Sequence, residues 1–130
     1  MEIHFLDELL PGYLWIFPVG GGEANGSPFA ALDLYDPAYV RFTRNGETKG
    51  MLPEPMVAAL PGNQVLVVGE SRRPYPNAQI YDVSEGAFHP TQSRATATRV
   101  GGAASPLMDG TVLLTGGGVI AIDTAEIYQP

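Results

Sequence analysis

Short apolar stretches, each bounded by turn residues and glycines, form the main hydrophobic pattern of this chain. In residues 108–117, MDGTVLLTGG, an Asp-Gly step precedes the apolar run Val112 to Leu114, and a glycine pair follows it. Asp-Gly is a frequent turn dipeptide, and a short apolar run between turns is typical of a β-strand buried on both faces. A second strand is expected in residues 124–128, TAEIY. The pattern therefore predicts a unit of turn, strand, glycines, loop and second strand.

This unit occurs twice more along the chain. Residues 60–69, LPGNQVLVVG, and 78–82, AQIYD, form one copy. Residues 10–21, LPGYLWIFPVGG, and 32–36, LDLYD, form the other. The tyrosines of the three copies lie 46 and 47 residues apart, and the turn glycines lie 50 and 48 residues apart. A shared period of this size is typical of propeller blades or solenoid arrays. The residues that mark the repeat are Tyr35, Tyr81 and Tyr128, with Gly20, Gly21, Gly69, Gly116 and Gly117.

Further strands are expected before and after these pairs. Phe42 and Phe88 each follow their tyrosine by seven residues, which indicates another strand beyond each Tyr-Asp turn. Asn45-Gly46 is predicted to be a turn. Met1 to Leu10 fits a helical face and a strand about equally, and its position before a turn favours a strand. We expect one domain, 1–130, with blade-like repeats at approximately 1–50, 51–98 and 99–130, the last of them one strand short.

The repeated stretches resemble kelch repeats of the kind found in galactose-oxidase-like propellers. The resemblance rests on MDGTVLLTGG and AEIY in the last copy, LPGNQVLVVGE and AQIYDV in the second, and LDLYDP with Phe42 in the first. It implies an all-β fold, a partial β-propeller of about three kelch-like four-stranded antiparallel blades with the last incomplete. The sequence departs from the family at Gly69-Glu70, where a glycine pair is usual, and in having Phe where a blade tryptophan is frequent.

Two cofactors that resemblances imply do not suit this sequence. The galactose-oxidase branch implies a copper centre with a Tyr-Cys crosslink, and the chain has no cysteine. Residues 2–26 are also similar to a segment of the flavin-dependent geranylgeranyl reductases. The Gly-rich dinucleotide fingerprint that such an enzyme needs is missing. We therefore expect no cofactor, and one interpretation of the second resemblance is a recombined N-terminal segment that packs irregularly.

Composition and charge narrow the classes of partner. Sixteen glycines and twelve prolines make the chain rich in turns, while 45% hydrophobic residues argue against disorder. A net charge of −7 makes nucleic acid and anionic membranes poor partners. No apolar run approaches the roughly 20 residues of a membrane-spanning helix, and the N-terminus lacks the pattern of a signal peptide. We expect a soluble protein whose compartment is left open.

Three blades do not close an ordinary propeller, which takes typically about 4–8. An open array leaves apolar faces and strand edges exposed to water. Either the chain is part of a longer propeller, or it completes a ring by self-association. A homodimer that forms a six-bladed ring is the simplest closed arrangement, and another protein is the alternative partner.

Neither metal binding nor catalysis is predicted for this chain. The two histidines, His4 and His89, belong to different repeats, and no His-x-x-x-His pattern occurs. No Gly-x-Ser-x-Gly motif is present for nucleophilic catalysis. Asp33 and Asp36 have the residue types of a glycosidase pair, but they belong to the repeated Tyr-Asp turn, where aspartate caps the backbone. The carboxylates are therefore assigned a structural role.

The loop Glu70 to Asn77, ESRRPYPN, is the candidate binding loop. Arg72 and Arg73 can form bidentate contacts to carboxylates, and Tyr75 offers a rigid amphipathic ring. Two functions follow. The first is a non-catalytic propeller segment that serves as a protein-interaction or assembly module. The second is a fragment of a larger propeller enzyme, carbohydrate-active or oxidase-like, whose catalytic residues lie outside this chain.

Overall fold

The computed structural model describes residues 2–5, 13–17, 29–36, 39–49, 55–70, 76–118, 120 and 122–130. For residues 2–5, 13–17, 29–31 and 47–49 it describes the backbone alone. All regular elements within these ranges are β-strands, which confirms the all-β prediction, and no helix long and apolar enough to cross a membrane occurs there. The strands are β1 Glu2–Phe5, β2 Tyr13–Phe17, β3 Phe29–Asp36, β4 Arg41–Lys49, β5 Met56–Leu60, β6 Gln64–Val68, β7 Ala78–Asp82, β8 Ala87–Pro90, β9 Ala103–Pro106, β10 Val112–Thr115 and β11 Ala125–Tyr128.

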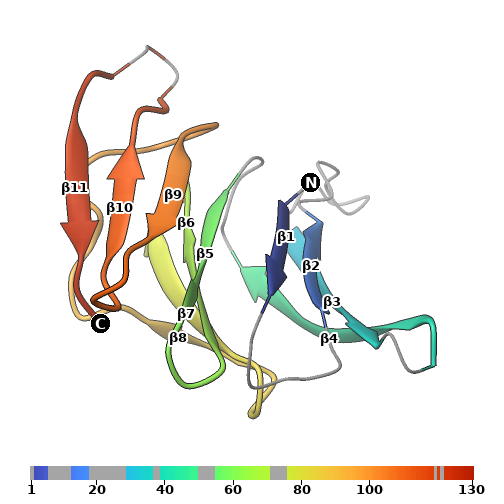
Figure 1. Ribbon diagram of the computed structural model, residues 1–130. Coiled ribbons are helices and arrows are strands. Elements are labelled where there is room, and N and C mark those ends of the chain that lie inside the picture. The colour runs from blue at the N-terminus through green and yellow to red at the C-terminus, as the bar shows by residue number, and fades with distance from the viewer. Residues whose placement is uncertain are drawn as a thin grey trace.

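Consecutive strands pair into three small antiparallel sheets (Figure 1). The first sheet has the order β1-β2-β3-β4, the middle sheet β5-β6-β7-β8, and the third sheet β9-β10-β11. The sheets lie side by side, with β5 of the middle sheet beside both β1 and β9. At the opposite edge of the middle sheet, β8 lies beside β4. The three sheets therefore follow one another along the chain. The first strand of the middle sheet lies next to the first strands of the other two.

The tyrosines that mark the repeat occupy equivalent places in the three sheets. Each lies on the third strand of its sheet, where Tyr35 pairs with Tyr13, Tyr81 with Val65, and Tyr128 with Val112. The partner is the first residue of the second strand in the first and third sheets, and the second residue of that strand in the middle sheet. The middle and third sheets therefore correspond residue by residue, with 47 added to each number.

A backbone hydrogen bond at the far end of these strands supports the same correspondence. The amide of Gly69 donates to the carbonyl of Asn77 at 3.0 Å, and the amide of Gly116 donates to the carbonyl of Thr124 at 3.4 Å. The turn glycines are displaced by one position in this correspondence: Gly62 has φ +75°, and Gly110, with φ +86°, takes the place of Asn63, which has φ +59°. Both glycine conformations are ones that this residue adopts readily.

The predicted turn at Asn45-Gly46 is wrong, because both residues lie inside β4. The pairing of β3 with β4 shifts register at this point: Leu32 faces Gly46 and Asp33 faces Arg44, so Asn45 has no opposite residue. This is a β-bulge, in which one extra residue bends a strand that continues past it. The dipeptide therefore produces a local irregularity in place of a chain reversal.

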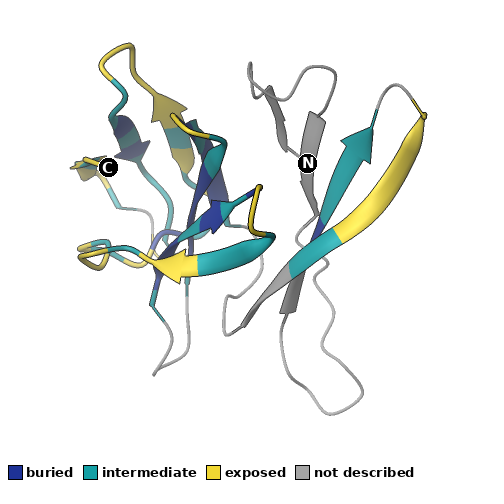
Figure 2. Cartoon of the chain, turned by 90° about the horizontal axis from the view of Figure 1, so that it is seen from below, coloured by how far each residue is buried: buried dark blue, intermediate teal, exposed yellow. Residues whose placement is uncertain are grey.

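The middle sheet is buried on both faces, and β6 shows how its sequence achieves this. Val65 and Val67 point to one side and pack in a cluster with Leu32 of the first sheet. Leu66 and Val68 point to the other side and pack against the third sheet. Side chains alternate between the two faces of a strand, so an uninterrupted apolar run suits a sheet with a neighbour on each side. Figure 2 shows the buried residues gathered between the sheets.

The strands β1 and β2 bear on the resemblance of the N-terminal segment to a reductase. Their backbones form a regular antiparallel ladder, in which Glu2 faces Ile16 and Phe5 faces Tyr13. The interpretation as a recombined segment predicts that residues 1–26 pack irregularly, whereas the backbone of these nine residues pairs regularly. The reductase resemblance itself stays a prediction from the sequence.

Candidate functional site

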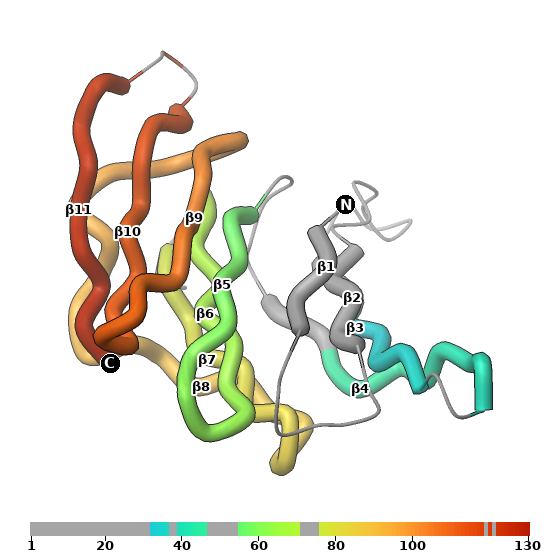
Figure 3. The backbone as a smooth tube through the Cα atoms, in the orientation of Figure 1, coloured from blue at the N-terminus to red at the C-terminus, as the bar shows by residue number. Residues whose placement is uncertain are grey.

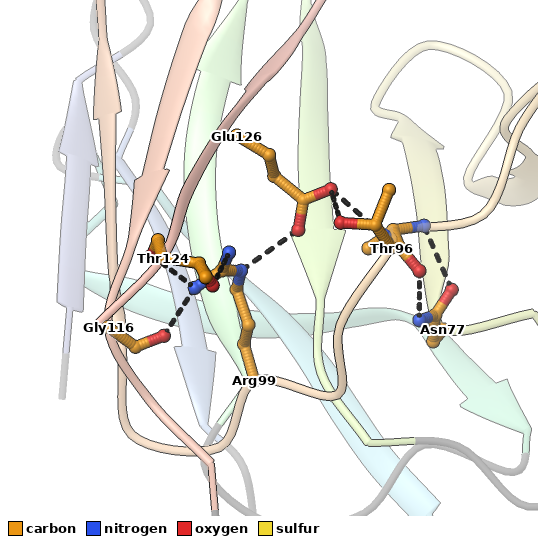
Figure 4. Close-up of polar contacts among 7 residues, drawn as sticks. Asn77, Thr96, Arg99, Gly116, Thr124 and Glu126 are labelled. Carbon is orange, nitrogen blue, oxygen red and sulfur yellow. Dashed lines mark hydrogen bonds and ion pairs between the residues drawn. The ribbon is translucent and has the colours of Figure 1, made fainter. Parts of the chain in front are cut away.

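A buried arginine clamps the linker between β8 and β9 onto the third sheet (Figure 4). Arg99 is fully buried, and its Nε donates to Glu126 Oε1 at 2.9 Å. Its Nη1 donates to the carbonyls of Gly116 at 2.7 Å and Thr124 at 3.0 Å, and its Nη2 donates to the hydroxyl of Thr124 at 3.1 Å. A buried guanidinium is tolerable only when it is paired and hydrogen-bonded in this way.

The linker is held at two further points. The second carboxylate oxygen of Glu126 accepts hydrogen bonds from the amide and the hydroxyl of Thr96, at 2.9 and 2.8 Å. Asn77 of the middle sheet exchanges two bonds with the backbone of Ala95, at 2.9 and 3.1 Å. Figure 3 follows residues 91–102 from β8 to β9 along the third sheet. The linker therefore ties the middle sheet to the third.

Glu126 is held ionised by these contacts. Burial alone raises the pKa of its carboxyl, but the hydrogen bonds from Thr96 and the bond and charge of Arg99 outweigh burial, so the pKa lies below its ordinary value. A carboxylate that accepts this many hydrogen bonds has little capacity left to take a proton. The arrangement is consequently suited to stability and not to acid-base catalysis.

A pocket of about 480 Å³ opens beside this clamp, between the middle and third sheets. Its inner wall is apolar, with Val68 and Ile80 from the middle sheet and Leu114 from the third. Its rim is polar, and Arg94 on the linker is the cation there. The remaining lining residues are Ala78, Pro90, Gln92, Ser93, Ala95 and residues 126–130. This is a space for an apolar group flanked by polar contacts.

The outer face of the third sheet is a second candidate surface. Leu113 and Ile127 face each other across β10 and β11, and Ile127 is 49% exposed. Thr115 and Ala125 form the next pair on the same face. In the middle sheet the corresponding residues include Leu66, which is fully buried. The outer face therefore has the sequence of an interface between sheets, although about half of the Ile127 surface on it is exposed.

Several residues that the sequence singled out lie outside the described residues. These are the whole candidate binding triad of Arg72, Arg73 and Tyr75, and the glycines Gly20 and Gly21. Of the other marker glycines, Gly117 lies where the linker crosses the third sheet: a Cβ added to it would be 3.0 Å from the amide nitrogen of Gly102. Close backbone approach is a reason for glycine at this point.

The turn role proposed for the Tyr-Asp aspartates is confirmed at Asp82. Its Oδ1 accepts bonds from the amides of Ser84 and Glu85 at 2.9 and 3.2 Å, and the side chain of Gln64 donates to its Oδ2 at 3.1 Å. The hydroxyl of Ser84 and the amide of Gln64 are the main causes that lower the pKa of Asp82 to about 2. In the first sheet, Asp36 accepts a bond from the amide of Tyr39 at 3.3 Å.

The described residues do not offer a donor set for a metal. No group of three or more His, Cys, Asp or Glu side chains comes together among them. His89 lies 2.8 Å from Glu85 in an exposed contact on one turn of the middle sheet. The chain also has no cysteine. The copper centre that the galactose-oxidase resemblance implies does not fit these residues.

The sequence did not single out Arg99 or Glu126. The available signal was weak: an arginine in a polar linker, and a glutamate in a short strand between alanine and isoleucine. Neither residue recurs in a way that the repeat would reveal, because Gln79 occupies the place of Glu126 in the middle sheet. The clamp depends on contacts 27 residues apart in sequence, which no local pattern encodes.

Comparisons with known proteins show a fold and no family. No protein-family model matches the chain, and no curated protein matches it. Among solved structures it is similar to a fungal alcohol oxidase of the AA5 family, determined in complex with copper, with a TM-score of 0.61 and 16% sequence identity. The match covers 92% of this chain and 26% of the oxidase, so this chain spans about a quarter of that protein's length. At this identity the likeness concerns the fold alone.

Proposed function

We propose that this chain is a three-bladed segment of a kelch-type β-propeller and that it serves as an assembly module. The sheets would be the blades, with β1, β5 and β9 as their innermost strands, and their outer faces would stack on further sheets of the same kind. The contact of β5 with both β1 and β9 supports a radial order of the sheets. The likeness to about a quarter of a much longer protein supports the idea of further blades.

The observation that carries the proposal is the match between the outer face of the third sheet and a buried face of the middle sheet. Leu66 and Ala78 of the middle sheet are buried against the third sheet. Their counterparts Leu113 and Ala125 lie on the outer face, with Ile127 in the place of Ile80. Covering a leucine or isoleucine side chain contributes about 1.5–3 kcal/mol when it is fully buried. A further sheet packed on the outer face of the third sheet would therefore stabilise the chain.

The first sheet carries the complementary face. In the middle sheet, the rings of Tyr81 and Phe88 are tilted against each other with centroids 5.0 Å apart, and they belong to the cluster that also contains Leu32 of the first sheet. In the first sheet, the rings of Tyr35 and Phe42 are tilted against each other at 4.9 Å, and Phe42 is 52% exposed. We propose that the outer face of one copy packs head to tail on this pair in a second copy. Two such contacts would close a homodimer with six blades.

The mass in solution tests this proposal. Light scattering is expected to give a dimer, twice the chain mass of 13.8 kDa. Ile127→Lys places a charge in the contact and is expected to give the monomer. Ile120→Lys is the matched control, because Ile120 is 84% exposed and lies between β10 and β11 but in neither strand, and it should leave the dimer intact. A wild-type chain that is monomeric at high concentration would contradict self-association.

A second candidate is that the chain belongs to a larger oxidase-like propeller enzyme whose catalytic residues lie elsewhere. The coverage of about a quarter of the AA5 alcohol oxidase favours it. Under this proposal the three sheets supply scaffold, and cysteine, tyrosine and histidine ligands follow or precede them in the full polypeptide. The transcript that encodes the chain decides the matter. A reading frame without such residues would exclude this candidate.

A further inference from the structure

The Asn45-Gly46 step of β4 lies at a break in the pairing of two strands. Asn45 has no opposite residue on β3, because Leu32 faces Gly46 and Asp33 faces Arg44. Its side chain is half-buried. In a regular ladder each residue is held by pairing with the neighbouring strand, whereas the extra residue of a bulge is left out of that pairing. The backbone at Asn45 is therefore held less firmly than the rest of β4.

The fold requires a glycine directly after Asn45. Gly46 has φ +154°, a conformation that other residues rarely adopt. A Cβ added to it would be 3.2 Å from Cε2 of Tyr81 and 3.4 Å from the carbonyl oxygen of Gly86. The missing side chain also leaves the amide nitrogen of Gly46 open to the side-chain carbonyl of Asn45. The glycine that permits close packing thus makes the asparagine reactive toward its own backbone.

Asn45 is also a contact between the first and middle sheets. Its backbone carbonyl accepts a hydrogen bond from the hydroxyl of Tyr81, a fully buried residue of β7. Its side chain lies over the turn between β7 and β8, where a Cβ added to Gly86 would be 3.3 Å from Oδ1 of Asn45. The same turn contains Asp82 and Glu85. A change in the covalent structure of Asn45 therefore acts directly on this interface.

We propose that Asn45 is a site of spontaneous deamidation and that its conversion loosens the first sheet from the middle sheet. The amide nitrogen of Gly46 forms a bond to Cγ of Asn45, and the side-chain nitrogen leaves as ammonia. Water then opens the cyclic imide at either of its carbonyl groups, which yields aspartate or isoaspartate. The net reaction consumes water and releases ammonia, without oxidation or reduction of the protein.

Both products weaken the contact with the middle sheet. Isoaspartate inserts the β-carbon of residue 45 into the main chain, which displaces the group that accepts the Tyr81 hydrogen bond. Either product adds a carboxylate over the turn that contains Asp82 and Glu85, and neighbouring like charges repel. The inference concerns an interface within one chain, so it does not depend on the proposed assembly.

Peptide mapping of the full chain after incubation at physiological temperature and pH tests the reaction. Chymotryptic cleavage after Phe42 separates Asn45 from Asn25-Gly26, the other Asn-Gly step of the sequence. The reference is the free peptide of residues 41–49, RFTRNGETK. Conversion of Asn45 in the folded chain is expected to be less than about tenfold slower than in the peptide, because no large opening of the sheet has to precede it.

Asn77 is the internal control for this measurement. Its side-chain amide is bonded at both ends to the backbone of Ala95, at 2.9 and 3.1 Å, and alanine follows it in the chain. It should stay unconverted while Asn45 reacts. An Asn45 that persists in the folded chain long after the peptide has reacted completely would overturn the proposal.

Hydrogen exchange tests the structural consequence. The converted chain carries an additional negative charge, so ion exchange separates it from the unconverted chain. Its amides in β4 and β8 should exchange faster, while those in β10 should not change. Asn45→Gln is the matched variant: its longer side chain disfavours the cyclic imide, so it should keep slow exchange after the same incubation. Unchanged exchange in β4 of the converted chain would contradict the loosening of the first sheet.

Discussion

The middle and third sheets share one register but differ in what surrounds them. Leu66 in the middle sheet is fully buried, and its counterpart Leu113 in the third sheet is only half-buried. The sequence at both places is that of a strand with a neighbour on each face. The comparison shows that apolar side chains at equivalent places of two sheets are buried to different extents, because the middle sheet packs against another sheet on each face.

The two interfaces on either side of the middle sheet also differ in their polar contacts. Toward the first sheet, the hydroxyl of Tyr81 donates to the backbone carbonyl of Asn45 in the bulge of β4. Toward the third sheet, the linker makes polar contacts to both sides, through Arg99 to Glu126 of the third sheet and through Ala95 to Asn77 of the middle sheet. One interface therefore uses a direct hydrogen bond between strands, and the other uses a linker that lies between them.

Replacing the equivalent leucines Leu66 and Leu113 by alanine should give the largest measurable difference between the middle and third sheets. Leu66→Ala leaves a cavity in a closely packed interface and should lower the free energy of unfolding by about 3 kcal/mol. Leu113→Ala in the monomeric chain should lower it by less than about 1.5 kcal/mol, because that side chain is partly in water. Urea denaturation measures both. Equal losses would mean that the outer face is already covered.

Truncating the clamp should have the next largest effect. Arg99→Ala leaves Oε1 of Glu126 and two carbonyl groups without this donor and should cost about 2–3 kcal/mol of stability. The cost is less than for a wholly buried pair, because Glu126 is partly exposed and keeps its two bonds from Thr96. Arg94→Ala is the control, and an exposed arginine should change stability by less than about 0.5 kcal/mol. Thermal unfolding compares the two variants. A loss at Arg99 no larger than at Arg94 would show that the clamp contributes nothing.

The equivalent tyrosines Tyr81 and Tyr128 test the difference in polar contacts between the two interfaces. Tyr81→Phe removes the hydrogen bond to Asn45 and should destabilise the chain by about 1 kcal/mol, since the carbonyl loses a buried donor. Tyr128→Phe removes a hydroxyl from a ring that lines an open pocket, and its effect should be within about 0.5 kcal/mol. Chemical denaturation of the two variants gives the comparison. A larger loss of stability for Tyr128→Phe than for Tyr81→Phe would contradict the stabilising role of the Tyr81 hydrogen bond.

Acid should weaken the third sheet through Glu126, where the middle sheet has the uncharged Gln79. The folded pKa of Glu126 lies below its ordinary value of 4.5, so its contribution is complete above about pH 4.5 and is lost as the pH falls through the folded pKa. The stability difference between wild type and Glu126→Gln should therefore shrink between pH 6 and pH 3. Urea midpoints at both values measure it. A difference independent of pH would mean that ionisation of Glu126 does not stabilise the fold.

The sequence predicted best the features that depend on residues close together in the chain. The apolar runs of β6 and β10 and the turn glycine Gly62 could be placed from periodicity and turn chemistry alone, because each depends on neighbouring residues. Asn45-Gly46 could not, since its bulge depends on the register of a partner strand. The Arg99 clamp could not be predicted either, because it joins a linker to two strands that come later in the chain. The pocket is lined by residues of the middle sheet, the linker and the third sheet, so its lining could only be seen in the fold.

Crosslinking between copies tests the proposed head-to-tail stacking most directly, and the absence of native cysteine makes it clean. The chain is made with Ile127→Cys, with Phe42→Cys, and with both, and is treated with a short bis-maleimide. The double variant should give a covalent dimer in high yield, while each single variant stays uncrosslinked, because the outer face of one copy meets the Tyr35–Phe42 pair of the next. A dimer formed by Ile127→Cys alone, or none with the double variant, would contradict the account.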